Sequence, residues 1–299
     1  MKHSSSLLVG LLNPLRRKGK RGLSDTSLDQ HRDTSQFGQW KRVLQAVRAA
    51  RRHVRFRRAQ ALFSREYPQL RALKDNYRGR RGFIVGNGPS LKSMNLSLLK
   101  DEFVCILNNG GRAIGDMLPH ADMHVVTDNN KYRRFAAELE SVALTNSIPY
   151  RFFNFKVRKD WMKLGQRSAR PYFIMGHPQS LTEKGFTRDP WHGYGECSTV
   201  ALWAVQIMHY MGFSEIYVLG VDLDYQSRGP YFYALGAKDR VHEEDPKVKA
   251  RRAAALPHAN KEFALALRAM QTDGRKLLNA GVGGHLSALP RVNFEALFA

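Results

Sequence analysis

The sequence is poor in acidic residues and in cysteine, and it has no long apolar run. Its two cysteines, Cys105 and Cys197, provide neither a disulfide framework nor the spacing of a metal site. The apolar run Leu7–Leu12 is far shorter than the roughly 20 residues that cross a bilayer, and basic residues follow it where a signal peptide has them in front. A hydrophobic content of 43% excludes disorder throughout. We therefore expect a soluble protein of a reducing compartment.

The shortage of acidic residues is concentrated at one end of the chain. The 299 residues contain 26 Asp and Glu against 48 Lys and Arg, a net charge of +22. Residues 1–80 hold 20 basic and 5 acidic side chains, so this segment carries +15 and the remainder carries +7. The excess belongs mainly to an N-terminal arm, for which we expect an anionic partner.

This arm divides into two parts. Residues 1–36 are rich in Ser, Gly and Arg, which predicts a disordered basic tail. Over residues 37–79, apolar residues recur at helical spacing from Trp40 to Leu73 around the basic run Arg51–Arg58, which predicts a basic amphipathic helical arm. Such a helix suits an anionic membrane surface or nucleic-acid phosphates, and packing on its own domain is equally open. Nucleic acid is the less favoured partner, because no recognised nucleic-acid-binding motif accompanies the charges.

From residue 80 onward the pattern is that of one α/β domain, residues 80–299. Short β-branched or aromatic runs alternate with helical segments, which predicts a Rossmann-like, mostly parallel sheet with helices on both faces. Strands are expected at 81–85, 103–107, 123–127, 150–155, 172–175, 215–219 and 276–279, and helices at 132–143, 199–211 and 258–271.

Polar and glycine residues gather after these strands, where open α/β sheets bind their ligands. The first strand is followed by Gly86, Asn87, Gly88, Pro89 and Ser90. Glycines there would let backbone N–H groups approach a phosphate or a ribose, and a following helix N-terminus favours negative charge. The loop lacks the lysine of a P-loop and the spacing of a dinucleotide fingerprint, so a plain strand-to-helix turn explains it equally well.

Three blocks of sequence carry a resemblance to a known superfamily: Gly86–Lys92, Gly212–Asp222 and Asp273–Ala280. In this order they resemble the bacterial superfamily of CMP-sialic-acid-dependent sialyltransferases, motility-accessory-factor glycosyltransferases and 6-hydroxymethylpterin diphosphokinase-like (MptE-like) proteins. The resemblance covers about residues 80–298 and leaves the basic arm unmatched. It implies a Rossmann-like domain that binds a nucleotide donor.

The sialyltransferase pattern also implies roles for individual residues. Where relatives carry a second donor-binding asparagine, this sequence has Asp128 followed by Asn129, either of which can take the role. Ser198 and Thr199 stand where relatives hold the donor carboxylate or phosphate, although plain helix capping fits them equally. The donor-binding set implied by the resemblance is Gly86, Asn87, Gly88, Pro89, Ser90, Asn108, Asp128, Asn129, Ser198, Thr199, Gly220 and Asp222.

For catalysis the resemblance implies two tyrosines and a histidine. Tyr225, with Tyr231 or Tyr233, is expected to donate hydrogen bonds to the departing phosphate, and core or lid aromatics are the competing interpretation. His258 is expected to be the general base that removes the acceptor's proton. Placed at a helix N-terminus, it would be kept neutral by the positive end of the helix dipole. A capping or surface histidine is the alternative, and His242 is the reserve candidate.

The resemblance implies a glycosyltransferase that moves an acidic sugar, sialic-acid-like or Kdo-like, from a CMP donor to a glycan or lipid-linked acceptor. Phenol and imidazole groups supply this chemistry, so no metal or cofactor beyond the donor is expected. The runner-up is transfer of diphosphate from ATP to a hydroxymethylpterin-like alcohol, which needs Mg²⁺. Outside enzymes, the alternative is a basic nucleotide- or nucleic-acid-binding protein. We expect a cytoplasmic chain, peripheral at the inner membrane face through residues 1–74, and the relatives imply a homo-oligomer.

Overall fold

A computed structural model describes residues 34–164, 170–224, 231–234 and 245–299. The chain divides into two compact units, Met1–Ala49 and Ala50–Ala299. The domain expected to begin at residue 80 therefore lies inside a unit that begins at Ala50. Most of the tail expected over residues 1–36 lies outside the described residues, and Thr34, Ser35 and Gln36 form the first turn of helix α1 (Thr34–Glu66).

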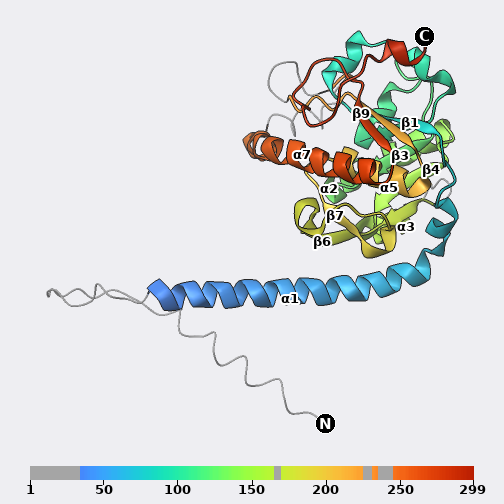
Figure 1. Ribbon diagram of the computed structural model, residues 1–299. Coiled ribbons are helices and arrows are strands. Elements are labelled where there is room, and N and C mark those ends of the chain that lie inside the picture. The colour runs from blue at the N-terminus through green and yellow to red at the C-terminus, as the bar shows by residue number, and fades with distance from the viewer. Residues whose placement is uncertain (1–33, 165–169, 225–230, 235–244) are drawn as a thin grey trace. The chain divides into compact units, whose positions relative to one another are not determined.

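The second unit is built on a seven-stranded sheet in which every neighbouring pair is parallel (Figure 1). Its strands are β1 (Arg81–Val85), β2 (Val104–Leu107), β3 (Met123–Val126), β4 (Tyr150–Asn154), β5 (Tyr172–Ile174), β8 (Glu215–Leu219) and β9 (Lys276–Asn279). The order is β5-β4-β3-β2-β1-β8-β9, so the chain reverses direction across the sheet between β1 and β8. The predicted Rossmann-like α/β fold and its seven strands are confirmed.

Helices and short 3-10 helices connect the strands. The α-helices are α2 (Asn129–Thr145), α3 (Arg158–Met162), α4 (Leu181–Lys184), α5 (Val200–Met211) and α7 (Pro246–Thr272). The 3-10 helices are η1 (Pro68–Leu73), η2 (Pro89–Ser93), η3 (Leu96–Asp101), η4 (Asn108–Ala113), η5 (Phe155–Val157), η6 (Pro190–His192) and η7 (Glu295–Leu297). A small second sheet pairs β6 (Gly176–Ser180) with β7 (Tyr194–Glu196). Among the described residues, no helix combines the length and apolar content that a bilayer span requires.

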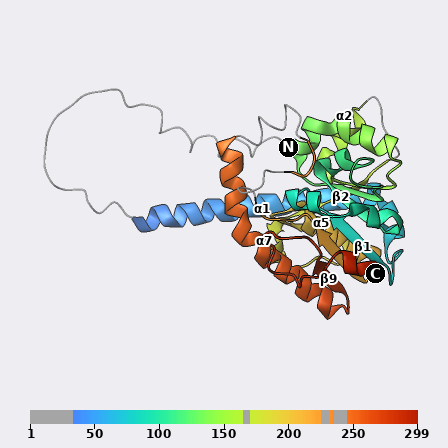
Figure 2. The ribbon, with the colours of Figure 1, turned by 90° about the horizontal axis from the view of Figure 1, so that it is seen from above.

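Both faces of the large sheet are buried, as a parallel sheet requires. Successive side chains of a strand point to opposite faces, so Ile84 joins the core shared with α5 and α7, whereas Phe83 and Val85 join the core on the other face. The second core is closed by η2, η3 and residues near the C-terminus. Figure 2 shows α7 beside β9 at one end of the sheet and α2 toward the other.

The C-terminal part of α1 belongs to the second unit and packs on it. Phe63 is fully buried, with its ring edge-to-face against Phe155 at a centroid distance of 5.5 Å. Gln60 Nε2 donates a hydrogen bond to the Trp191 carbonyl oxygen at 2.6 Å. Packing on its own domain, the alternative left open from the sequence, therefore holds for this part of the helix.

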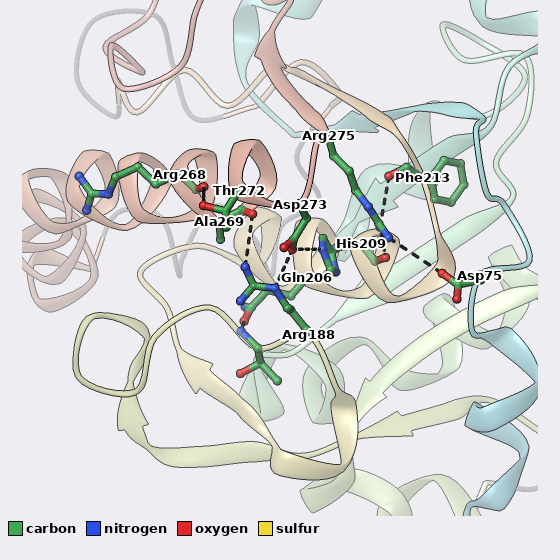
Figure 3. Close-up of polar contacts among 11 residues, drawn as sticks. Asp75, Arg188, Gln206, His209, Phe213, Arg268, Ala269, Thr272, Asp273 and Arg275 are labelled. Carbon is green, nitrogen blue, oxygen red and sulfur yellow. Dashed lines mark hydrogen bonds and ion pairs between the residues drawn. The ribbon is translucent and has the colours of Figure 1, made fainter.

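A cluster of polar side chains binds the C-terminal end of α5, which lies away from the carboxyl edge of the sheet (Figure 3). The Asp273 carboxylate, just after α7, is bound by His209 Nε2 of α5 at 2.8 Å and by Arg188 Nε at 2.6 Å. The Arg275 guanidinium donates to the backbone oxygens of His209 and Phe213. These contacts tie α5 to α7 and β9, and they fix the direction in which α5 points its N-terminus.

A buried ion pair joins α2 to β4. Arg151 and Glu140 have side-chain exposures of 3% and 2%, and their N and O atoms lie 3.1 Å apart. Burial lowers the pKa of Arg151, and the Glu140 carboxylate opposes that effect. Each charge is therefore acceptable in the core only while the other is present.

We predict that Arg151→Met lowers the free energy of unfolding by roughly 3–5 kcal/mol, because it leaves the Glu140 carboxylate buried and uncompensated. The double variant Arg151→Met/Glu140→Met should recover most of this loss. Chemical denaturation of the full chain measures both. A double variant no more stable than Arg151→Met would show that the loss does not come from the unpaired charge.

Candidate functional site

A cavity of about 820 Å³ opens at the carboxyl edge of the sheet. Its walls come from the segments that follow β1, β2, β3, β4 and β8, together with the N-terminus of α5. It therefore spans the point at which the chain reverses between β1 and β8, where open α/β sheets bind ligands. The location predicted from the sequence for the site coincides with this cavity.

Most of the candidate residues from the sequence are brought together here. Those that line the cavity are Gly86, Asn87, Gly88, Pro89, Asn108, Asp128, Asn129, Ser198, Thr199, Gly220, Asp222 and Tyr231. Ser90 lies behind the wall and is 3% exposed. Tyr225 and His242 lie outside the described residues, and His258 is not among the lining residues.

Backbone hydrogen bonds join the loops that follow β1 and β8. The Gly86 N–H donates to the Leu219 carbonyl oxygen and the Gly88 N–H to that of Gly220, each at 2.8 Å. A Cβ atom on Gly86 would lie 2.3 Å from the Gly220 oxygen. Glycine is therefore required at position 86 by the close approach of another backbone, whatever the loop binds.

The Asp222 side chain also joins these two loops. Its carboxylate accepts hydrogen bonds from the Ser90 N–H at 3.0 Å and from the Ser90 hydroxyl at 2.5 Å. A Cβ on Gly88 would lie 2.5 Å from the same carboxylate. Ser90 and Asp222, both expected from the sequence to bind the donor, bind each other and hold the loop in shape.

Three asparagines from neighbouring strand ends, Asn87, Asn108 and Asn129, line the cavity. Their Oδ1 atoms are themselves buried, and they accept no hydrogen bond from any described residue. Buried polar atoms are almost always paired, so three unpaired amide oxygens mark this part of the cavity wall as unusual.

The choice between Asp128 and Asn129 is clear from their contacts. The Asp128 carboxylate caps α2 by accepting the N–H groups of Asn130 at 2.9 Å and Lys131 at 3.1 Å. Asn129 has the unpaired Oδ1 described above. The geometry favours Asn129 for ligand contact and gives Asp128 a structural role.

The N-terminus of α5 forms another wall. Thr199 is its N-cap, and its hydroxyl accepts the Ala201 N–H at 3.3 Å, so the capping alternative holds there. The Ser198 N–H donates to the Glu262 carboxylate at 2.9 Å. Burial raises the pKa of Glu262, which is 5% exposed. The Glu262 carboxylate therefore already lies at the positive end of the α5 dipole, which faces this part of the cavity.

Two lysines that the sequence analysis did not select also line the cavity. Lys131 follows β3 and Lys156 follows β4, and both line the cavity. Lys131 Nζ lies 5.5 Å from the ring centroid of Tyr231, which stacks on Tyr233 at 5.1 Å. Their positions after parallel strands were the available signal, because the same rule that selected Asn108 applies to them.

The expected setting of His258 is wrong. The helix predicted to begin there is α7, which begins at Pro246 and runs through Pro257 in its interior. His258 therefore lies near the middle of α7 and not at a helix N-terminus. Its side chain is exposed and, one turn before Glu262, acts electrostatically on that carboxylate.

Among the described residues, four carboxylates line the cavity: Asp128, Glu196, Asp222 and Asp224. Asp222 accepts hydrogen bonds from Ser90, and Asp128 caps α2. Within residues 34–164, 170–224, 231–234 and 245–299, no three His, Cys, Asp or Glu side chains gather as possible ligands of one ion.

The family of 6-hydroxymethylpterin diphosphokinase MptE-like proteins matches residues 59–228, more than half of the chain. The chain belongs to the MptE-like family. This match confirms the resemblance inferred from the three sequence blocks, and it extends into the C-terminal part of α1. No curated protein matches this MptE-like chain.

Solved structures with a similar arrangement include two kinds of transferase. The MAf glycosyltransferase from Magnetospirillum magneticum has a TM-score of 0.43 and 14% identity, covering 76% of this chain and 38% of its own. The sialyltransferase CstII from Campylobacter jejuni, in complex with CMP-3FNeuAc, has a TM-score of 0.45 and 15% identity, covering 71% of this chain and 86% of its own. The MptE-like chain thus spans well under half the length of the MAf protein.

We predict that Asp222→Ala lowers the free energy of unfolding by roughly 1–3 kcal/mol, because the Ser90 N–H and hydroxyl lose their acceptor. Ser93→Ala is the matched control, since the Ser93 hydroxyl binds the Ser90 carbonyl oxygen and leaves Asp222 untouched. Thermal unfolding measures the effect. Equal stability of the two variants would remove Asp222 as the element that shapes the loop.

Proposed function

We propose that this chain is a glycosyltransferase that moves an acidic sugar from a CMP donor to an acceptor hydroxyl of a glycan or a lipid-linked sugar. The observation that supports the proposal is the placement of two lysines and a helix N-terminus on a cavity wall that also carries four carboxylates. Lys131, Lys156 and the N-terminus of α5 can meet the phosphate and carboxylate of such a donor. The three asparagines that line the cavity carry amide groups, which suit the hydroxyl and amino groups of a cytidine.

The proposed chemistry uses the side chains of the protein alone. Tyr231, which lines the cavity, donates a hydrogen bond to the departing phosphate, and Tyr225 is proposed to join it. His258 takes the proton of the acceptor hydroxyl as its oxygen bonds to the sugar carbon. The bond from that carbon to the phosphate oxygen breaks, and CMP leaves with the electron pair.

A second candidate is favoured by the family match. The description of the family is that of a 6-hydroxymethylpterin diphosphokinase, so transfer of diphosphate from ATP to a pterin-like alcohol is the alternative reaction. This reaction requires Mg²⁺ to neutralise the phosphates. A nucleotide-binding protein without catalysis is the remaining alternative.

Product release separates these functions. The full chain is incubated with CMP-sialic acid, with CMP-Kdo, or with ATP and 6-hydroxymethylpterin, each with and without EDTA. We predict release of CMP that survives EDTA, because the donor's charge is met by lysines and a helix terminus. Release of AMP that depends on Mg²⁺ would establish the diphosphokinase instead, and nucleotide binding without any turnover would establish the non-enzyme.

The charge argument has its own matched pair of variants. Lys156→Ala removes a cation that lines the cavity, whereas Lys159→Ala removes an exposed cation of α3 that does not line it. We predict that the first raises the KM for the CMP donor about tenfold and that the second leaves it unchanged. Equal effects would mean that only the general charge of the domain matters.

His258→Ala should lower transfer by at least about 100-fold while changing the Kd for CMP less than twofold, because a general base acts on the acceptor and not on the donor. His120→Ala is the control, since His120 lies before β3, at the opposite edge of the sheet. Transfer by His258→Ala at the rate of His120→Ala would remove His258 as the base.

We also propose that the first unit binds an anionic membrane surface, which would place the enzyme at the inner face of the cell membrane. In α1, Trp40, Val43, Leu44 and Val47 are 42–65% exposed, and the helix has no acidic residue before Glu66. Apolar side chains among cations are typical of helices that lie in a lipid headgroup layer.

The triple variant Trp40→Ser/Val43→Ser/Val47→Ser should lose flotation with phosphatidylglycerol vesicles, because the apolar contribution to insertion is removed. Leu144→Ser, which changes an equally exposed leucine on α2, should float as the wild type does. Flotation of the wild type with neutral vesicles to the same extent, or its preference for RNA at matched salt, would contradict this proposal.

A further inference from the structure

Two side chains bind the backbone where the chain leaves β2, one from the side of β1 and one from the side of β3. From the β1 side, Asn87 Nδ2 donates to the Leu107 carbonyl oxygen at 3.1 Å. From the β3 side, His124 Nε2 lies 2.5 Å from the Asn108 carbonyl oxygen. Two consecutive carbonyl groups are therefore fixed where the chain turns from β2 into η4, beside the cavity.

Asn108 adopts a left-handed backbone conformation. Its φ is +50°, in a region that most residues other than glycine avoid and that asparagine tolerates better than others. Its side chain lines the cavity, and its Oδ1 is buried and accepts no hydrogen bond from any described residue. The left-handed conformation thus coincides with a side chain that lines the cavity.

Burial of His124 in this strand has a free-energy cost. It is fully buried in β3, beside Arg151 in the register of β3 and β4. A carbonyl oxygen only accepts hydrogen bonds, so Nε2 carries the proton, and Nδ1 is left buried with no partner among the described residues. Burial lowers the pKa of His124 to about 4, so its imidazole is neutral in ordinary conditions.

This free-energy cost indicates that His124 has a role other than stabilising the fold. A buried nitrogen without a partner destabilises a protein, and an aromatic hydrocarbon of similar size would avoid that penalty. The one hydrogen bond in which the described structure engages this imidazole is the bond to Asn108. Strain of this kind is retained at sites where it arranges a ligand contact.

We propose that His124 is a positioning residue that holds Asn108 in its left-handed conformation and thereby directs the Asn108 amide at the nucleotide donor. This inference rests on the proposed function for its ligand, a cytidine nucleotide. It adds a residue that does not line the cavity and acts only through a carbonyl group.

The test compares three variants of the full chain by CMP titration, by the KM and kcat for the CMP donor, and by chemical denaturation. His124→Phe removes the donor to Asn108 and should raise the Kd for CMP and the KM about tenfold, with kcat changed much less. His124→Gln places an amide N–H near the former Nε2 and should restore most of the affinity. A role in packing alone predicts a change of stability in His124→Phe with the CMP affinity of the wild type.

His120→Phe is the matched control. His120 also binds a backbone oxygen next to β2, that of Glu102 at 3.1 Å, but at the opposite edge of the sheet. It should leave CMP affinity unchanged. Wild-type CMP affinity in His124→Phe would overturn the inference, and so would equal losses in the two phenylalanine variants.

A crystal structure of His124→Phe separates this inference from the proposed function. Asn108 is expected to leave the left-handed region once its carbonyl group is released, and this readout needs no ligand. Retention of a positive φ at Asn108 would overturn the inference. If the wild type bound no nucleotide, the proposed function would fail, whereas the conformation of Asn108 would still report on His124.

Discussion

The structure depends on the hydrogen bonds that join the segment after β1 to the segment after β8. The two strands are neighbours in space although more than a hundred residues separate them, and the chain reverses across the sheet between them. Backbone hydrogen bonds from Gly86 and Gly88, together with the hydrogen bonds between Asp222 and Ser90, hold the two segments together. One wall of the cavity is thereby rigid before any ligand arrives, and the ordering of this loop is not left to the binding step.

The strands could be predicted from the sequence because parallel strands buried on both faces read as continuous apolar runs, as in Phe83–Val85. The position of the site followed from the rule that the carboxyl edge of such a sheet binds ligands. The contacts of single residues could not be predicted in this way. Asp222 binds Ser90 and His124 binds Asn108 across strands, and local sequence does not show which distant group a side chain meets.

His258 illustrates a different limit. Pro257 favoured a helix start at that position, since proline is common in the first turn of helices. The residues before it are mostly basic and small, so no apolar periodicity marked the preceding turns of α7, which begins at Pro246. The net charge of +22 likewise contains two separate contributions. The arm carries most of it, whereas the cavity wall holds a few cations, such as Lys131 and Lys156, after defined strands and beside four carboxylates.

The central claim is that the hydrogen bonds between the segments after β1 and β8 shape a binding site for a cytidine nucleotide. Titration of CMP into the full chain and into Gly88→Ala tests it most directly, because the added methyl group would lie 2.5 Å from the Asp222 carboxylate and displace it from Ser90. The account predicts saturable binding by the wild type and at least about a tenfold loss in Gly88→Ala. Equal binding by both proteins, or no binding by the wild type, would contradict it.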